Sequence, residues 1–99
     1  MGFFQVTANE LRSKAGTLQD LNYQFYTKST ELAEKENSLC GMWEGQARDA
    51  FHHAFLNDRQ QMEVFHKLIG RYVQALFEIA ARYEEAEARN AELAASRNY

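Results

Sequence analysis

Three histidines and one cysteine are the side chains of this sequence best suited to bind a metal ion or to react with a substrate. His52 and His53 are adjacent, so on a helix their side chains point about 100° apart and cannot hold one ion from one face. Neither has a histidine or carboxylate four residues later, and His66 follows about three turns or more further on. A zinc site needs three or four converging ligands. The spacing therefore predicts no metal site and favours histidines at the surface or at an interface.

Patterns typical of catalysis are absent from the sequence. It contains no glycine-rich phosphate-binding loop, no nucleophile elbow and no His-Glu-X-X-His pair. The single cysteine, Cys40, has no partner for an internal disulfide, and we expect it to be a small apolar residue of a turn. An intermolecular disulfide in an oxidising environment is the alternative. The sequence predicts a protein that is not an enzyme, with no cofactor and no small-molecule substrate.

Composition limits the class of fold and the kind of partner. The 99 residues include no proline and only five glycines, which argues against a turn-rich β-sandwich or barrel. This length predicts a single domain over residues 1–99. A net charge of −3 provides no basic surface, so nucleic acid is not an expected partner.

The first ten residues, MGFFQVTANE, lack the features of a cleaved signal peptide: a basic start, an adequate apolar stretch and a small-residue cleavage site. No apolar run approaches the roughly 18 residues that a membrane-spanning helix needs. If the protein is secreted, we expect it to leave the cytoplasm without a cleaved signal peptide.

A first helix is predicted over residues 8–38. Thr7 and Glu10 have the spacing of a capping box, and Val6 is placed to pack on Leu11. Apolar side chains then recur every seven residues, which is two helical turns and places them on one face. The members of this leucine line are Leu11, Leu18, Phe25, Leu32 and Leu39.

A second, longer helix is predicted over residues 46–95. Its apolar residues follow alternating steps of four and three, a pattern typical of long helices packed side by side. They are Phe51, Phe55, Met62, Phe65, Ile69, Tyr72, Leu76, Ile79 and Tyr83, with Asp58 in the one polar position. A short turn over residues 39–45 makes neighbouring helices antiparallel. The pattern predicts an all-α helix-turn-helix hairpin whose two apolar lines face each other.

Pairing the helices about a point near residue 43 predicts individual contacts. Phe25 is expected near Met62. Gly16 falls opposite Gly70, and two facing glycines in helix interiors indicate a close crossing of the helices, with coincidence as the alternative.

The second helix is apolar over more of its circumference than one neighbouring helix covers. Leu68, Val73 and Phe77 widen the stripe, so they predict an interface with a partner. A side-by-side dimer that forms a four-helix bundle would cover it. Phe3, Phe4 and Val6 can cover the second helix to about Ile79, and from Tyr83 onward we expect it to protrude.

The turn between the helices contains the only tryptophan. Gly41 can take the left-handed conformation that closes a helix, and Gly45 permits a second sharp dihedral before the next helix. Between them, Trp43 can cap the apolar end of the hairpin and can also serve as a docking anchor. With its Trp-Glu-Gly turn at mid-chain and long amphipathic helices on both sides, the sequence resembles the WXG-motif, early-secreted-antigen-like family of about 100-residue hairpins, which are substrates of type VII secretion.

A second motif of that family is a C-terminal export signal, in which a tyrosine is followed four residues later by Asp or Glu. Tyr83 and Glu87 fit it, and one turn apart on a helix they share a face. The alternative is that Tyr83 ends the apolar line and Glu87 belongs to a solvated charged face.

The resemblance implies a secreted protein that leaves as a folded dimer, as an effector or a co-exported adaptor. The implied partners are a second copy, another WXG-type hairpin or the helical region of a toxin, and the ATPase of the secretion system. A cytosolic helical interaction module or chaperone-like partner, in which the Trp43 turn is only structural, is the alternative.

Overall fold

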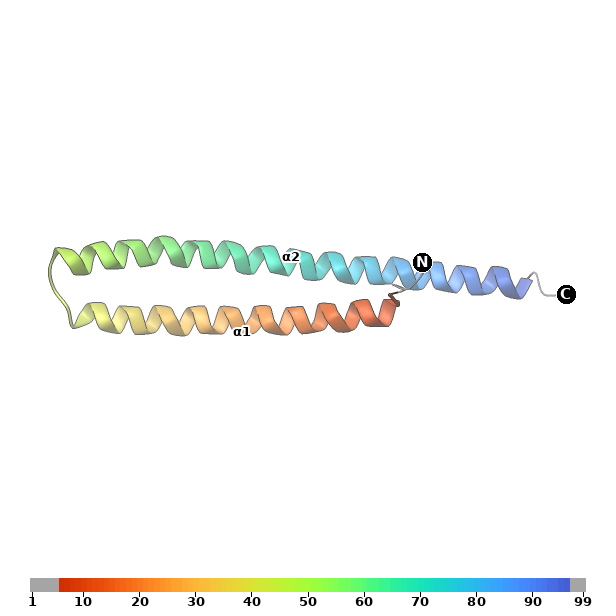
Figure 1. The fold of residues 1–99 in the computed structure, drawn as a ribbon, viewed down its shortest axis with the longest axis horizontal. Coiled ribbons are helices and arrows are strands. Elements are labelled where there is room, and N and C mark those ends of the chain that lie inside the picture. Colours follow the sequence, from red (N-terminus) through yellow and green to blue (C-terminus); the bar gives the residue numbers. More distant parts are fainter. Residues whose placement is uncertain (1–5, 97–99) are drawn as a thin grey trace.

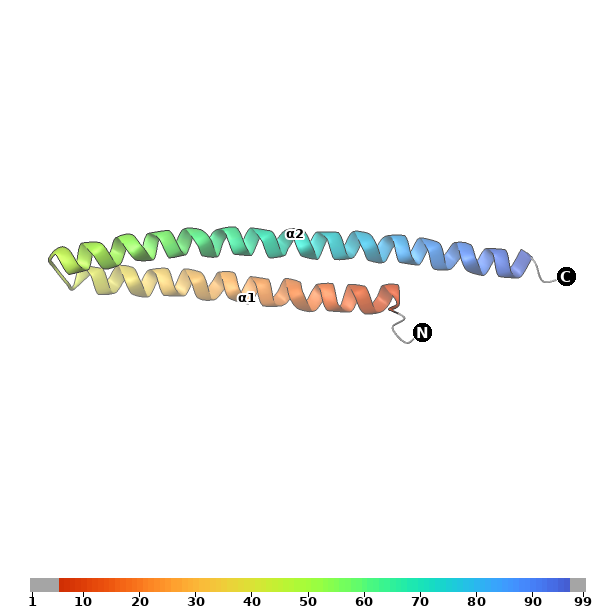
Figure 2. The ribbon, with the colours of Figure 1, turned by 45° about the horizontal axis from the view of Figure 1, so that its top comes forward.

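The computed structural model describes residues 6–96, and in that range it contains two α-helices and no strand. Helix α1 spans Ala8–Gly41 and helix α2 spans Gln46–Ser96. The two lie antiparallel and side by side, and α2 extends well beyond the start of α1 (Figures 1 and 2). The molecule is a rod of 83 × 21 × 17 Å. The predicted all-α hairpin is confirmed.

Local side-chain chemistry fixes the start of α1. Thr7 has an extended backbone, and its hydroxyl accepts a hydrogen bond from the backbone N–H of Glu10 at 3.1 Å. This bond satisfies one of the N–H groups that have no partner within the first turn of a helix. At the other end α1 runs to Gly41, beyond the predicted residue 38, so the turn is confined to residues 42–45.

The side chains that α1 buries are not those of its leucine line. They are Ala8, Ala15, Ser29, Glu36 and Cys40. Four of these, together with the half-buried Asn22, recur every seven residues and form a line of small and polar side chains. Leu32 and Leu39 remain 47% and 45% exposed. The leucine line is therefore not the line that α1 buries, and the expectation that it forms the core of the hairpin is wrong.

Polar contacts set the register between the two helices. Glu36 contacts His52 at 2.8 Å, and Asn22 contacts His66 at 3.0 Å. Asn22 and Glu36 are fourteen residues apart on α1, and their partners on α2 are also fourteen residues apart. The same pairing of the two helices therefore repeats every seven residues. It places Ala15 opposite Val73, and both are buried.

The line of small and polar side chains on α1 therefore forms the inner seam of the hairpin. Small side chains allow two helices to approach closely, and buried polar groups are tolerated where they are hydrogen-bonded. Near the turn the seam is polar, with Ser29 donating to the sulfur of Met62 at 3.4 Å. Near the open end it is built from alanine and valine, because Ala8, Val73 and Ala80 are all buried there.

The large apolar side chains form a second surface beside this seam, here called the apolar face. Phe25 packs edge-on against Phe65, with ring centroids 5.3 Å apart, which places the leucine line of α1 next to one line of α2. Because both lines repeat every seven residues, they stay next to each other along the rod. The exposed or half-buried members are Leu11, Leu18, Phe25, Leu32, Leu39, Phe51, Phe65, Tyr72 and Ile79.

The predicted close crossing of the helices at Gly16 and Gly70 is absent. A side chain added at Gly16 would meet nothing within 4 Å, and at Gly70 only the Asn22 amide at 4.0 Å, so these glycines mark no close crossing. Phe25 lies against Phe65, and the Met62 sulfur accepts a hydrogen bond from the Ser29 hydroxyl. The proposed covering of α2 by residues 3–5 lies outside the described residues.

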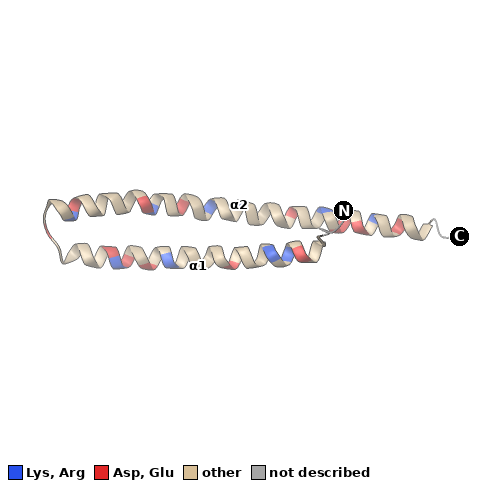
Figure 3. Ribbon diagram, in the orientation of Figure 1, with Lys and Arg blue, Asp and Glu red and all other residues tan. Residues whose placement is uncertain are grey.

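Charged side chains of both signs are interspersed along the two helices (Figure 3). In the part of the chain that the structure describes, no stripe of lysine and arginine follows either helix. Neither of these helices combines the length and the apolar character that a membrane span requires.

Candidate functional site

The turn brings Trp43 beside the first turns of α2. Its ring lies 5.9 Å from that of Phe51 in the first turns of α2, at an interplanar angle of 50°. Gly45 has φ of 118°, a conformation that side-chain-bearing residues rarely adopt, and its carbonyl accepts the backbone N–H of Asp49 at 3.2 Å. Gly41 does not take the left-handed conformation that the sequence allowed and is the last residue of α1. Among the described glycines, Gly45 alone has a positive φ.

The second motif lies where α2 leaves α1. Tyr83 is 46% exposed, Glu87 is exposed, and every side chain from residue 81 to residue 96 is exposed. Because the two residues are four apart on a continuous helix, the ring and the carboxylate lie on the same face, one turn apart. A protein that binds this segment could therefore contact both side chains without displacing α1.

A bidentate ion pair lies where α2 begins to extend past α1. The guanidinium of Arg12 donates to both carboxylate oxygens of Glu84, at 2.8 and 3.0 Å. The hydrogen bond from Arg12 lowers the pKa of Glu84 below its ordinary value. Planar bidentate pairs of this kind fix orientation as well as distance. The first turns of α1 are thus attached to α2 at the residue next to Tyr83.

The three residues predicted at a partner interface do not form one surface. Val73 is only 1% exposed and belongs to the inner seam, so its assignment to an external interface is corrected. Leu68 is 37% exposed and Phe77 is half-buried. Nine residues apart, Leu68 and Phe77 point in opposite directions on α2 at about 100° per residue. The wide apolar arc that predicted the interface is divided between the seam and the exposed apolar face.

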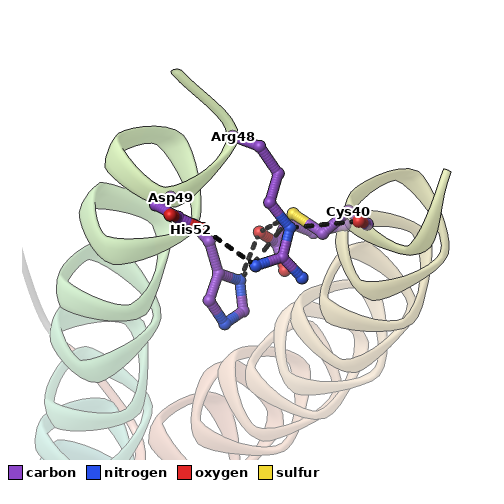
Figure 4. Close-up of polar contacts among 5 residues, drawn as sticks. Cys40, Arg48, Asp49 and His52 are labelled. Carbon is purple, nitrogen blue, oxygen red and sulfur yellow. Dashed lines mark hydrogen bonds and ion pairs between the residues drawn. The ribbon is translucent and has the colours of Figure 1, made fainter. Parts of the chain in front are cut away.

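A buried polar cluster lies directly beneath the turn (Figure 4). The carboxylate of Glu36 accepts a hydrogen bond from His52 Nδ1 at 2.8 Å and another from the Cys40 thiol at 3.1 Å. Cys40 Sγ lies 3.9 Å from His52 Nδ1. Glu36 is 6% and Cys40 3% exposed, while His52 is half-buried. The cluster joins the last turns of α1 to the first turns of α2.

These contacts shift the acidity of two groups in opposite directions. The hydrogen bond from His52 is the main reason why the pKa of Glu36 is lowered, so this carboxyl is ionised at neutral pH. Burial, followed by the hydrogen bond to Glu36, raises the pKa of the Cys40 thiol. Arg48 lies beside the cluster: its Nε donates to the Cys40 carbonyl at 3.1 Å, and its Nη1 pairs with Asp49 at 3.1 Å.

The spacing of the histidines does not reveal this cluster, because its other two members lie on α1. Glu36 and Cys40 are four residues apart and therefore share a helix face. This spacing is the sequence signal that points to part of the cluster, and the search for metal ligands around the histidines does not include it. His52 joins them only through the register of the hairpin. His53, the adjacent residue, is exposed.

The fold and the turn together define a class of protein, the two-helix hairpin with a Trp-X-Gly turn. The chain belongs to the WXG100 family, proteins of 100 residues with WXG, whose sequence profile matches residues 4–88. This finding confirms the predicted family.

Solved structures show the same fold. A point mutant of the secreted protein EsxB from Bacillus anthracis str. Sterne is 24% identical, with a TM-score of 0.76 over 86% of this chain and 96% of that one. Selenomethionine-labelled EsxB is 23% identical, with a TM-score of 0.77 over 88% and 99% of the two chains. No protein with curated annotation matches the sequence.

Proposed function

We propose that this protein is a substrate of a type VII secretion system that is exported as a folded dimer and acts as a secreted effector or a co-exported adaptor. The observation that carries the proposal is the exposed pair of Tyr83 and Glu87, one turn apart on the segment of α2 that extends past α1. Membership of the WXG100 family supports it. EsxB, which has the same fold, is described as a secreted protein.

In this proposal the ATPase of the secretion system binds the Tyr83 and Glu87 side chains. A ring and a carboxylate on one exposed helix face offer an apolar contact and a charged contact at fixed separation. The Arg12–Glu84 pair holds the first turns of α1 against α2 at the residue next to Tyr83. The ATPase can therefore bind the exposed segment while the hairpin stays folded.

Dimerisation would use the apolar face. Phe65, Tyr72 and Ile79 are 49%, 53% and 40% exposed and follow one line of α2, beside the leucine line of α1. Fully burying one such side chain contributes about 1.5–3 kcal/mol, so a row of them supports a stable helix–helix interface. A second copy covers this face in a four-helix bundle, and another WXG-type hairpin or the helical region of a toxin presents the same kind of surface.

Export in the native host tests the signal. The intact protein should reach the medium, whereas folded Tyr83→Ala and Glu87→Gln variants should accumulate inside the cell. Leu93→Ala is the matched control, because Leu93 is 53% exposed on the same projecting segment and outside the motif. Retention of the intact protein while the secretion system is active would instead support a cytosolic interaction module. Export of all variants would remove the two residues from the signal.

The mass in solution tests the dimer. By light scattering the purified protein should have twice its 11.5 kDa chain mass. Phe65→Glu should give monomers, because it places a charge at the centre of the apolar face. Val64→Glu should remain dimeric, since Val64 is 58% exposed and lies one residue away on a different side of α2. A monomeric wild-type protein would indicate pairing with a different hairpin, and a dimeric Phe65→Glu variant would exclude the apolar face.

A further inference from the structure

The cluster beneath the turn contains three different metal-binding side chains. The carboxylate of Glu36, the thiol of Cys40 and the imidazole of His52 place one ligand atom each within 4.8 Å of one another. Two of them come from the end of α1 and one from the start of α2. Glu36 and Cys40 are buried, and His52 is half-buried. Figure 4 shows Cys40 and His52 turned toward each other between the two helices.

The separations between the ligand atoms are close to those around a tetrahedral zinc ion. With bonds of about 2.3 Å to sulfur and about 2.0 Å to nitrogen and oxygen, such an ion holds its ligand atoms roughly 3.3–3.5 Å apart. The three pairs here lie 2.8, 3.1 and 3.9 Å apart. Each separation has to change by only about 0.5 Å, which side-chain rotation can provide.

We propose that Glu36, Cys40 and His52 form a binding site for a divalent transition-metal ion, with Zn²⁺ the best match. A thiolate and an imidazole favour zinc over magnesium or calcium, which prefer oxygen ligands alone. Three protein ligands leave a fourth position for water or an added ligand. An open hollow that Glu36, His52, Asn37 and Arg59 line in part adjoins two of the three ligands.

The charges at this site suit a divalent cation. With the thiol deprotonated, Cys40 and Glu36 together carry two negative charges, which equal the charge of the ion. The neighbouring guanidinium of Arg48 is already paired with Asp49 and adds no net charge. A neutral assembly is the arrangement with the smallest cost of burial.

Binding replaces hydrogens that the side chains now share. The Cys40 S–H proton, which points to Glu36, is released to solvent as the sulfur–metal bond forms. On His52 the proton moves from Nδ1 to Nε2 by exchange with water, so that the Nδ1 lone pair faces the ion. One proton is therefore released for each ion bound, and no redox step is involved.

The bound ion would fasten α1 to α2 next to the turn that carries Trp43. It would act as a structural link, since metal binding stabilises only the state in which the ligands converge. Because His52 meets Glu36 and Cys40 only in the folded hairpin, we expect thermal stability to rise with metal concentration. This inference is independent of export.

Cobalt titration of the full-length, tag-free protein under reducing conditions tests the site. Co²⁺ bound through a thiolate gives a sulfur-to-metal charge-transfer band in the near ultraviolet, and a four-coordinate site also gives visible bands. We expect both bands at one ion per chain, their loss on addition of Zn²⁺, and a higher melting temperature with Zn²⁺. Absence of the charge-transfer band in the wild-type protein would overturn the proposal, whatever the variants do.

Three variants assign the ligands. Cys40→Ser should abolish the charge-transfer band, and His52→Gln and Glu36→Gln should each weaken Zn²⁺ binding by more than about 100-fold, because losing even an outer-shell partner costs 10–100-fold. His53→Gln is the matched control and should bind as the wild type, since His53 is exposed and adjacent to the site without belonging to it. Circular dichroism checks that each variant is helical. Zn²⁺ affinity that is unchanged in folded His52→Gln and Glu36→Gln would overturn the proposed ligand set.

Discussion

Asn22 and His66 bind each other twice across the middle of the hairpin. The Asn22 side-chain amide donates to the His66 backbone carbonyl at 3.0 Å, and its oxygen accepts from His66 Nδ1 at 3.0 Å. The imidazole also stacks on Tyr26, with ring centroids 4.8 Å apart. A one-residue slip of either helix would break both bonds. This pair therefore helps to fix the register that places every other contact along the seam.

A double-mutant cycle can measure that contribution. Asn22→Ala and His66→Ala should show a coupling free energy of about 0.5–1.5 kcal/mol in denaturant unfolding, the range expected for a net hydrogen-bonded interaction. The cycle cancels the change in helix propensity that each alanine brings. Gln24→Ala with His66→Ala is the control cycle, because Gln24 is exposed, and it should give no coupling. Additive effects of Asn22→Ala and His66→Ala would show that the pair does not stabilise the register.

The inner seam also predicts a contrast between two valines of α2. Val73 is 1% exposed and Val64 is 58% exposed. Val73→Ala should lower the free energy of unfolding by about 2 kcal/mol, because it removes two buried methyl groups and leaves a small cavity. Val64→Ala should change it by less than about 0.5 kcal/mol. Equal effects in urea denaturation would place Val73 outside the core of the hairpin.

Much of the fold follows from local signals in the sequence. The capping pair Thr7 and Glu10 predicts the start of α1, and the glycine before Gln46 predicts the start of α2. The length of the apolar repeat predicts that α2 outlasts α1. These features depend on residues close together in the chain, so they need no knowledge of the packing.

The inner face of α1 could not be predicted in the same way. The leucine line and the line through Ala15 and Ser29 lie only about 60° apart on the helix. Hydrophobicity favours burying the leucines, and it does not distinguish a face that meets α2 from a face that is left for another surface. The cluster of Glu36, Cys40 and His52 depends on the same register, so it could not be found before the two helices were paired.

The turn gives a prediction about backbone conformation. Gly45→Ala should destabilise the hairpin by about 1–3 kcal/mol, because φ of 118° is strained for any residue with a side chain. Gly41→Ala is the matched control: it lies in the last turn of α1, has no positive φ, and an added side chain meets nothing within 4 Å. There alanine should be neutral or slightly stabilising. If thermal unfolding shows the same loss for both variants, the strain at Gly45 is not the cause.

The ion pair at the open end gives a prediction about pH. The pKa of Glu84 is lowered by its hydrogen bond from Arg12, so the pair stabilises the folded state above the ordinary pKa of a glutamate. That contribution is lost as the pH falls through the lower, folded-state pKa of Glu84. Because Glu84 is exposed, the effect on global stability should be small, and the pKa itself is the better observable. In an NMR titration of the side-chain carboxyl carbons, Arg12→Gln should raise the pKa of Glu84 toward its ordinary value. Arg89→Gln should leave it unchanged, because Arg89 pairs with Glu85 instead. A pKa of Glu84 that is the same in Arg12→Gln and in the wild type would show that the first turns of α1 are not attached to α2 at this residue, next to Tyr83.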